Sequence, residues 1–505
     1  MVVERPAQVV TETYDGVFLV WVLNQTIEKI PSGLNNIFAG NIFYPHKNVM
    51  AYSDLLVPSA FLSALGVKMT GQPQMATSVM LILGQMLSLL VVYFWWLELS
   101  GSPWAAFLGS VALGLSQIRF TYYVHLQMWT MQWWLIASWM LWRFFKNGKV
   151  WQIYLGGTFL VLQVWESLLP VFFIGVVGAI LLIQNREKLK RNWRHFAVVT
   201  ILVATASLPV IKTYWEVSRE FDYQRPIREV AHFSASVDDL WGSFLAPGLY
   251  ILFAAALAEM AKKLSLKNKN LLFLFIVLAV GAIMFLGPAL KWQGKTVKVF
   301  GNIPIPLPYA LAYYLIPGFG ALRTPSRWIW LSAWAASGII VLGFSKYKFR
   351  KVKELGLLVV ASIIAVFAGT HLKKVYEIPR VEEYPKIYKW LESQPGKVVI
   401  ELPIYTWGAG EIASREVYRM VFSLEHKKYL VNGYSGFFPP EWERLAADLW
   451  TGFPSSELED KLKERGVNYI IVHKDECPED KLRQIEEWGE GRLIWEDESV
   501  QAYRL

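Results

Sequence analysis

Residues 74–95 read QMATSVMLILGQMLSLLVVYFW and contain no charged side chain. An apolar stretch of roughly 17–25 residues is long enough to cross the hydrocarbon layer of a membrane as a helix. Similar segments recur along the chain, near 103–120, 125–145, 151–165, 167–184, 196–213, 246–262, 271–290, 326–345 and 355–371. The sequence therefore predicts a polytopic α-helical membrane protein with about ten spanning helices.

The overall composition agrees with a membrane protein. The chain is 54% hydrophobic and 18% charged, whereas soluble domains carry about 25% charged residues. Its 24 Trp and 23 Tyr suit the aromatic belts at the membrane surface. A further apolar stretch, 55–67, is too short to span the bilayer, and we predict an interfacial or re-entrant helix there.

Basic linkers between the predicted spans indicate their orientation. Four linkers are rich in Lys and Arg, and threading the helices through the bilayer puts them all on one side: 143–149, 186–194, 262–269 and 346–353. Cytoplasmic loops carry this excess of positive charge, so that side is cytoplasmic. Orientation thus accounts for the net charge of +9 without a nucleic-acid partner.

This threading divides the chain into three parts. Residues 1–73 form a first extracytoplasmic loop with interfacial helices, and residues 74–371 form the transmembrane helical domain. Residues 372–505 have the composition of a soluble domain and lie outside the cell. We therefore predict a multi-pass protein of the plasma membrane.

The soluble part alternates predicted helices and strands. Helical patterns cover 384–393, 441–450, 456–465 and 481–488, and strand patterns cover 398–402, 469–472, 492–496 and 499–504. Such alternation predicts an α/β layer structure. No glycine-rich phosphate loop follows any of these strands, so no nucleotide site is expected. The single cysteine, Cys477, excludes an internal disulfide framework.

Ionisable residues are scarce inside the spans, where Glu259 and Glu166 are the main ones. A transporter or proton pump is expected to hold charges near the bilayer midplane. In this chain the polar residues gather at the outer ends of the helices, which favours a reaction at the outer surface over conduction through the middle.

The first candidate for chemistry is Asp15, which precedes the apolar run Val17–Leu23. A carboxylate at the membrane surface can act as a general base or coordinate a cation. The alternative is a helix N-cap, which the local sequence alone favours over a catalytic residue. His46 and Asp54 lie in the next turn-rich polar stretch, where a plain surface loop is the alternative.

A polar link between two spans, residues 116–127, holds Arg119, His125 and Gln127. Histidine is easily tuned for proton transfer near neutral pH, although the tyrosines of this link also suit interfacial anchoring. Glu166 follows at the outer end of a span. A buried carboxylate there is a functional candidate, and a structural pair with Arg119 is the alternative.

Arg323 and Arg327 end a loop rich in proline and glycine and open a predicted spanning helix at Pro325. Free N–H groups, the helix dipole and forked guanidinium donors make such a place suitable for a phosphate. The alternative is contact with lipid head groups.

These motifs together resemble the GT-C superfamily of polytopic glycosyltransferases, in a prokaryotic branch of uncharacterised membrane proteins. The resemblance covers nearly the whole chain. It rests on Asp15-Gly16, Phe43-Tyr44-Pro45, His125-Leu126-Gln127 with Gln132-Trp133, the pattern Arg323, Pro325 and Arg327, and the runs Asn432–Glu441 and Gly466–His473.

The resemblance implies a sugar donor on a polyprenyl phosphate and Asp15 as the catalytic base. Superfamily members carry a spanning helix ahead of this aspartate. Residues 1–14 lack an apolar core, so a first helix is expected to be missing from this sequence. The resemblance also implies a second acidic site, for which Glu166 and Asp54 are the candidates.

We therefore predict transfer of a sugar from polyprenyl phosphate to an acceptor at the outer face, with inversion because no second carboxylate nucleophile is evident. His125 and Glu166 would assist Asp15, and Arg323, Arg327 and Arg119 would bind the phosphate. His46, Asp54 and Gln127 would contact acceptor or sugar. A divalent metal is compatible with this chemistry, but no ligand cluster argues for one. The alternatives are a lipid or polysaccharide transporter or flippase, and a non-catalytic scaffold.

Overall fold

A computed structural model describes residues 5–33, 36–222, 224–243, 247–261, 268–346 and 376–505. The chain forms two compact units. The sheet unit comprises Met1–Met80, Pro209–Phe221 and Lys374–Leu505, and the helical unit comprises Leu81–Leu208 and Asp222–Lys373.

The helical unit contains most of the predicted spans. Its main helices are α3 (Met75–Ser100), α4 (Pro103–Gly114), α7 (Gln132–Asn147), α8 (Trp151–Glu166), α9 (Leu169–Gln184), α11 (Trp193–Glu220), α14 (Pro247–Ala261), α15 (Lys269–Phe285) and α17 (Ile329–Phe344). Helices α3 and α11 each continue into the sheet unit. Shorter helices connect them, namely α5 (Gln117–Thr121), α6 (Leu126–Trp129), α10 (Arg186–Arg191), α12 (Ile227–His232), α13 (Leu240–Ser243) and α16 (Pro308–Leu315).

Three helices in the described part of the chain are long and apolar enough to cross a membrane: Met75–Ser100, Trp193–Glu220 and Pro325–Phe344. Shorter apolar helices cover Leu169–Gln184, Tyr250–Ala261 and Lys269–Phe285. The predicted span 355–371 lies outside the described residues, as do most of the basic linkers 262–269 and 346–353.

The prediction of one continuous helix over 103–120 is wrong. Helix α4 ends at Gly114, and α5 begins at Gln117 after an extended Ser116. The Ser116 hydroxyl donates to the carbonyl of Leu113 at 2.6 Å. A serine that bonds the nearby backbone in this way competes with the helical hydrogen-bond ladder, and the break leaves the polar link 116–127 as a separate segment.

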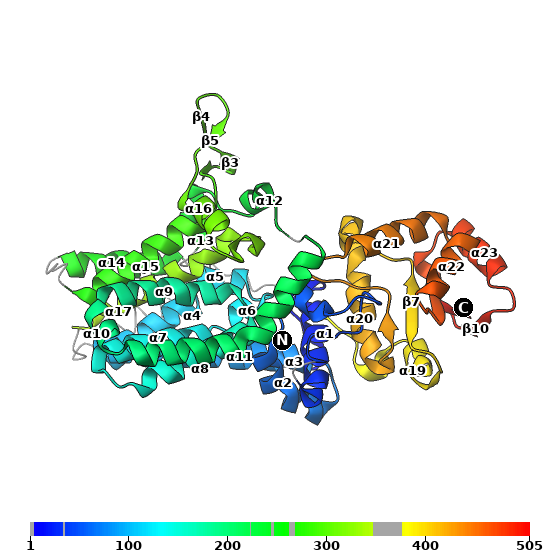
Figure 1. Cartoon of the computed structure of the whole chain (residues 1–505), viewed down its shortest axis with the longest axis horizontal. Coiled ribbons are helices and arrows are strands. Elements are labelled where there is room, and N and C mark those ends of the chain that lie inside the picture. The colour runs from blue at the N-terminus through cyan, green and yellow to red at the C-terminus, as the bar shows by residue number, and fades with distance from the viewer. Residues whose placement is uncertain (1–4, 34–35, 223, 244–246, 262–267, 347–375) are drawn as a thin grey trace. The chain divides into compact units, whose positions relative to one another are not determined.

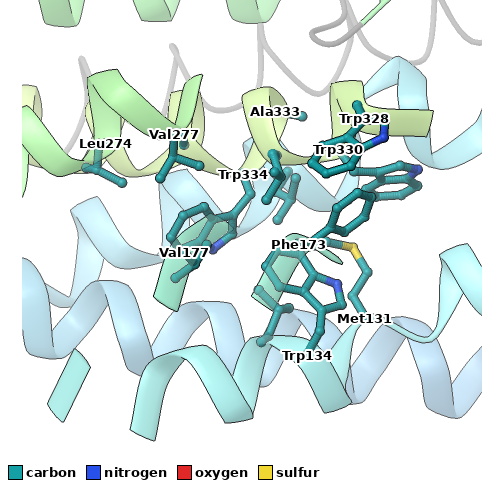
Figure 2. Packing of buried hydrophobic residues seen from close by; sticks show 14 of the residues in the cluster. Met131, Trp134, Phe173, Val177, Leu274, Val277, Trp328, Trp330, Ala333 and Trp334 are labelled. Carbon is teal, nitrogen blue, oxygen red and sulfur yellow. The ribbon is translucent and has the colours of Figure 1, made fainter. Parts of the chain in front are cut away.

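Tryptophans of α17 and of the turn that precedes it contribute large rings to the core of the helical unit. Trp334 lies 4.8 Å from Trp95 and 6.0 Å from Trp134 between ring centroids, and Trp328 lies 5.2 Å from Phe173. Figure 2 shows the rings of Trp134, Phe173, Trp328 and Trp334 between the helices. Because large aromatic rings dominate the packing here, the turn that begins α17 is held by buried side chains on several sides.

Two short hairpins follow α15. They pair β2 (Lys291–Trp292) with β3 (Lys295–Thr296) and β4 (Lys298–Val299) with β5 (Ile303–Pro304). In Figure 1 they project beyond α16.

The sheet unit contains a five-stranded sheet in the order β10-β11-β9-β7-β8. Its strands are β7 (Val398–Leu402), β8 (Tyr429–Leu430), β9 (Tyr469–His473), β10 (Leu493–Glu496) and β11 (Val500–Arg504). Strand β7 is parallel to both neighbours, and β11 is antiparallel to β9. The helices of this part are α19 (Lys386–Ser393), α20 (Ser414–His426), α21 (Pro440–Gly452), α22 (Ser456–Glu464) and α23 (Glu479–Trp488).

These elements confirm each strand and helix that the sequence predicts beyond residue 376. Helix α20 and the short strand β8 were not predicted from the sequence.

The N-terminal residues belong to the same unit as the sheet. Helix α1 (Asp15–Lys29) packs on α20, and α2 (Val57–Thr70) packs on α1. Strand β1 (Val9–Val10) pairs with β6 (Tyr376–Glu377). The loop 41–44 also joins the sheet edge, because the amides of Phe43 and Tyr44 donate to the carbonyls of Asn432 and Leu430.

Candidate functional site

Asp15 is the first residue of α1 and is partly exposed. The helix-capping role that was the alternative for Asp15 is filled by Glu12. The carboxylate of Glu12 accepts the backbone N–H groups of Tyr14 at 2.9 Å and Gly16 at 3.4 Å. Burial, together with the nearby charge of Asp15, raises the pKa of Glu12. The carboxylate of Asp15 instead receives the phenol of Tyr434, at 3.3 Å from its Oδ1.

Tyr434 is 4% exposed and is held by rings on both sides. Its ring lies 5.6 Å from Phe18 and 6.0 Å from Phe438, both edge to face. Two residues earlier, the amide of Asn432 exchanges hydrogen bonds with the backbone of Glu401 at 2.7 and 2.8 Å. The side chain that reaches Asp15 is therefore anchored to strand β7. The sequence motif Asn432–Glu441 includes Tyr434, but no role was predicted for this residue by itself.

His46 and Asp54 also lie in the sheet unit. The ring of His46 is 5.8 Å from Phe221, and its burial lowers the pKa of His46. Asp54 is half-buried just before α2. The structure thus places the two predicted acceptor residues in the unit that contains Asp15.

In the helical unit, two predicted segments meet. The phenol of Tyr122, in the link 116–127, lies 2.9 Å from the hydroxyl of Ser326. Ser326 stands between Arg323 and Arg327, in the single 3-10 turn Pro325–Trp328 that leads into α17. The ring of His125 packs against Tyr122 at 5.7 Å.

A cavity of about 370 Å³ opens where these segments meet. Tyr122 and Ser326 line it, together with Phe233 and Asp239. The guanidinium of Arg323 lies 4.9 Å over the ring of Phe233. An arginine next to a cavity with a polar wall can bind an anion there.

Arg119 and Glu166 contact the residues that follow the link, Trp129 and Thr130. Arg119 is 1% exposed, and its guanidinium lies 4.2 Å over the ring of Trp129 while donating to the carbonyl of that residue at 2.8 Å. It also donates to the side chain of Gln85. These contacts fix the position of the guanidinium inside the helical unit. Glu166, at the end of α8, accepts the hydroxyl of Thr130 at 2.8 Å. Gln127 is half-buried on α6.

A buried cluster of charges in the sheet unit escaped the sequence analysis. The guanidinium of Arg419 contacts Glu416 at 2.8 Å and Glu476 at 2.6 Å. A third carboxylate, Glu401, lies 3.6 Å from its Nε and bonds the Nε2 of His473 at 2.8 Å. Three carboxylates thus surround one guanidinium beneath β7.

The cluster divides its charge unequally. Burial raises the pKa of Glu416 to about 7, although Arg419 opposes this shift. Burial acts in the same direction on Glu401, but the bonds from His473 and the charge of Arg419 outweigh it and hold the pKa of Glu401 below its ordinary value. Below about pH 7 the cluster therefore holds one proton, on the carboxyl group of Glu416.

We expect Glu416→Gln to change how stability depends on pH. The folded state keeps the Glu416 proton up to about pH 7, whereas the unfolded carboxyl loses it near its ordinary pKa of 4.5. Between these values the folded state binds more protons, so stability falls as pH rises, by about 3 kcal/mol over the window. The glutamine variant should lose this slope.

The thermal unfolding midpoint of both chains from pH 4 to pH 8 measures this effect. The comparison between chains is needed because His426, whose pKa burial lowers to about 4, contributes the opposite slope below its ordinary value. A difference between the two chains that stays constant over this range would contradict the assignment.

No group of three or more His, Cys, Asp or Glu side chains that could hold a metal ion occurs within the described ranges. The divalent metal therefore stays a prediction, and no step below depends on it.

No protein-family model matches this chain, and no curated protein matches its sequence. The solved structures that are similar in fold include two enzymes. The arabinofuranosyltransferase AftD from Mycobacteria matches with a TM-score of 0.59 at 14% identity, over 100% of this chain and 38% of that one. The oligosaccharyltransferase AglB from Archaeoglobus fulgidus, solved with an inhibitory peptide and a dolichol-phosphate, matches with a TM-score of 0.51 at 11% identity.

The match to AglB covers 94% of this chain and 67% of that protein. This chain thus spans well under half the length of AftD and about two thirds of AglB. At these identities the likeness concerns the fold, which is GT-C-like.

Proposed function

We propose that this chain is a membrane glycosyltransferase that moves a sugar from a polyprenyl-phosphate donor to an acceptor at the outer face of the plasma membrane. The observation that carries the proposal is the meeting of the turn 323–328 with the link 116–127 around one cavity. The GT-C-like fold, shared with two enzymes that transfer sugars, supports it. The basic linkers orient the chain with its C-terminal domain outside the cell.

The turn 323–328 would bind the donor phosphate. Arg323 and Arg327 supply forked donors on either side of Ser326, and charge that develops on a departing phosphate is stabilised by such preorganised groups. His125, packed on Tyr122, and Glu166 would orient the sugar. Arg119 would act mainly by holding the link in place.

Asp15 would act as the general base. Its carboxylate takes the proton of the acceptor hydroxyl while the acceptor oxygen bonds to the anomeric carbon and the bond from that carbon to the phosphate oxygen breaks. Displacement in a single step inverts the anomeric carbon, and polyprenyl phosphate leaves. His46, Asp54 and Gln127 would contact the acceptor or the sugar.

Substitution of the two arginines tests the phosphate assignment. We expect Arg323→Ala and Arg327→Ala each to slow transfer roughly 10²–10³-fold, as the loss of one preorganised donor does. The assay uses the full chain in nanodiscs, a panel of polyprenyl-phosphate-linked pentoses and hexoses as donors, and release of polyprenyl phosphate as the readout.

Arg228→Ala is the matched control, because this arginine is exposed on α12 in the same unit and lies outside the turn. It should keep full activity. Unchanged rates in both Arg323→Ala and Arg327→Ala would remove the phosphate site, and with it the transferase proposal.

A further inference from the structure

The sheet unit contains a second cavity, of about 310 Å³, which none of the predicted site residues lines. Its floor is apolar and includes Leu402, Phe453 and Ile485, which are 4%, 1% and 1% exposed. One side is formed by Trp450, at the end of α21, which is 51% exposed. The cavity therefore combines a buried, apolar floor with an aromatic ring that is exposed to solvent.

Strand topology explains why a hollow forms at this place. Strands β7 and β9 are parallel neighbours, so their carboxyl ends lie at the same edge of the sheet. The chain leaves β7 through Pro403 and turns into α23 through Cys477 and Pro478, and all three residues line the cavity. Open α/β sheets bind their ligands in crevices at such edges.

The rim of the cavity is polar but close to neutral. Asp480 and Lys481 contribute opposite charges, and Thr451 and Gln484 contribute uncharged groups. The ammonium of Lys481 donates to the carbonyl of Thr451 at 3.3 Å, across the rim. A rim of this kind offers hydrogen bonds without the positive charge that a phosphate or nucleotide needs.

The cysteine in the wall adds a further restriction. Burial, with the nearby charge of Glu476, raises the pKa of Cys477 to about 11. The group is therefore a neutral thiol at physiological pH, whereas metal binding and nucleophilic attack require the thiolate. The wall suits a neutral ligand.

We propose that this cavity binds a neutral glycan. The C–H face of a sugar ring would lie on the ring of Trp450, whose π face is negative, and its hydroxyl groups would bond Asp480, Gln484 and Thr451. An apolar floor with a few convergent polar groups is the usual build of a small-ligand site. The inference goes beyond the proposed function and uses it only as the reason for a glycan to be present.

Binding to the full chain tests the inference. The probe is an array of neutral oligosaccharides built from arabinose, mannose, galactose and glucose, applied to the chain in nanodiscs, with titration calorimetry on those retained. We expect at least one to bind and Trp450→Ala to weaken it about tenfold or more, since a truncated tryptophan commonly dominates a binding site. Gln484→Ala should weaken it less.

Trp292→Ala is the matched control, because Trp292 is 55% exposed and belongs to the hairpins of the other unit. It should bind like the unchanged chain. So should Asp15→Asn, because Asp15 does not line the cavity, and this result keeps glycan binding separate from transfer. Retention of no oligosaccharide, or equal affinity in Trp450→Ala, would overturn the inference.

Discussion

Replacing Asp15 by asparagine is expected to abolish nearly all sugar transfer while leaving the fold intact. Asparagine has the same shape and still accepts the hydrogen bond from Tyr434 that the structure gives Asp15, but it cannot take a proton from the acceptor. Loss of a general base typically costs roughly 10²–10⁴-fold in rate. The measurement is the release of polyprenyl phosphate in the donor-panel assay, at saturating donor.

Two further variants make this result specific. Asp460→Asn removes an exposed carboxylate on α22 and should keep full activity. Tyr434→Phe keeps the ring between Phe18 and Phe438 but loses the phenol, so kcat should fall by a smaller factor than in Asp15→Asn while KM stays the same. A fully active Asp15→Asn chain would exclude Asp15 as the base.

The elements predicted best are those whose signals are local. Strand β7 covers the predicted range 398–402, because a buried strand reads as a short apolar run after a turn. Helix α22 covers most of the predicted range 456–465 and begins after Ser455, whose hydroxyl accepts the N–H of Leu458, a cap of the kind that starts helices. In both cases a few adjacent residues carry the whole signal.

The wrong prediction of one continuous span over 103–120 also has a local cause, which is a single residue. Hydropathy averages over the window and does not register one serine. The bond from Ser116 to the carbonyl of Leu113 ends α4 within a stretch that remains apolar throughout. Helix α20 was missed for a related reason, since its buried face includes Glu416 and Arg419 and so interrupts the apolar stripe that marks a helix.

Contacts between distant residues were beyond the reach of the sequence. Tyr434 meets Asp15 across 419 positions, and the amide of Phe43 meets Asn432 across nearly as many. These motifs all contribute to the resemblance to the GT-C superfamily, but the resemblance does not predict which of them are in contact. Only the fold shows that the run Asn432–Glu441 bonds the residue predicted to be the base.

Replacing Arg419 by methionine is expected to destabilise the sheet unit by about 3–5 kcal/mol, the cost of leaving buried charges without their partner. Arg419 is 2% exposed and contacts three carboxylates. Methionine has a similar length but no charge, so the carboxylates of Glu401 and Glu476 would lose their counter-charge in a buried site.

Hydrogen exchange of the amides in β7 and β9 measures this locally, and their protection should fall sharply in Arg419→Met. Arg380→Met is the control, since Arg380 forms an exposed pair with Glu383 and surface pairs contribute little. Adding Glu476→Gln to Arg419→Met should restore part of the protection, because neutralising a stranded carboxylate removes a buried charge that has lost its partner. If Arg419→Met alone kept full protection, the cluster would not stabilise β7, the strand to which Asn432 bonds, and the placement of Tyr434 against Asp15 would need another support.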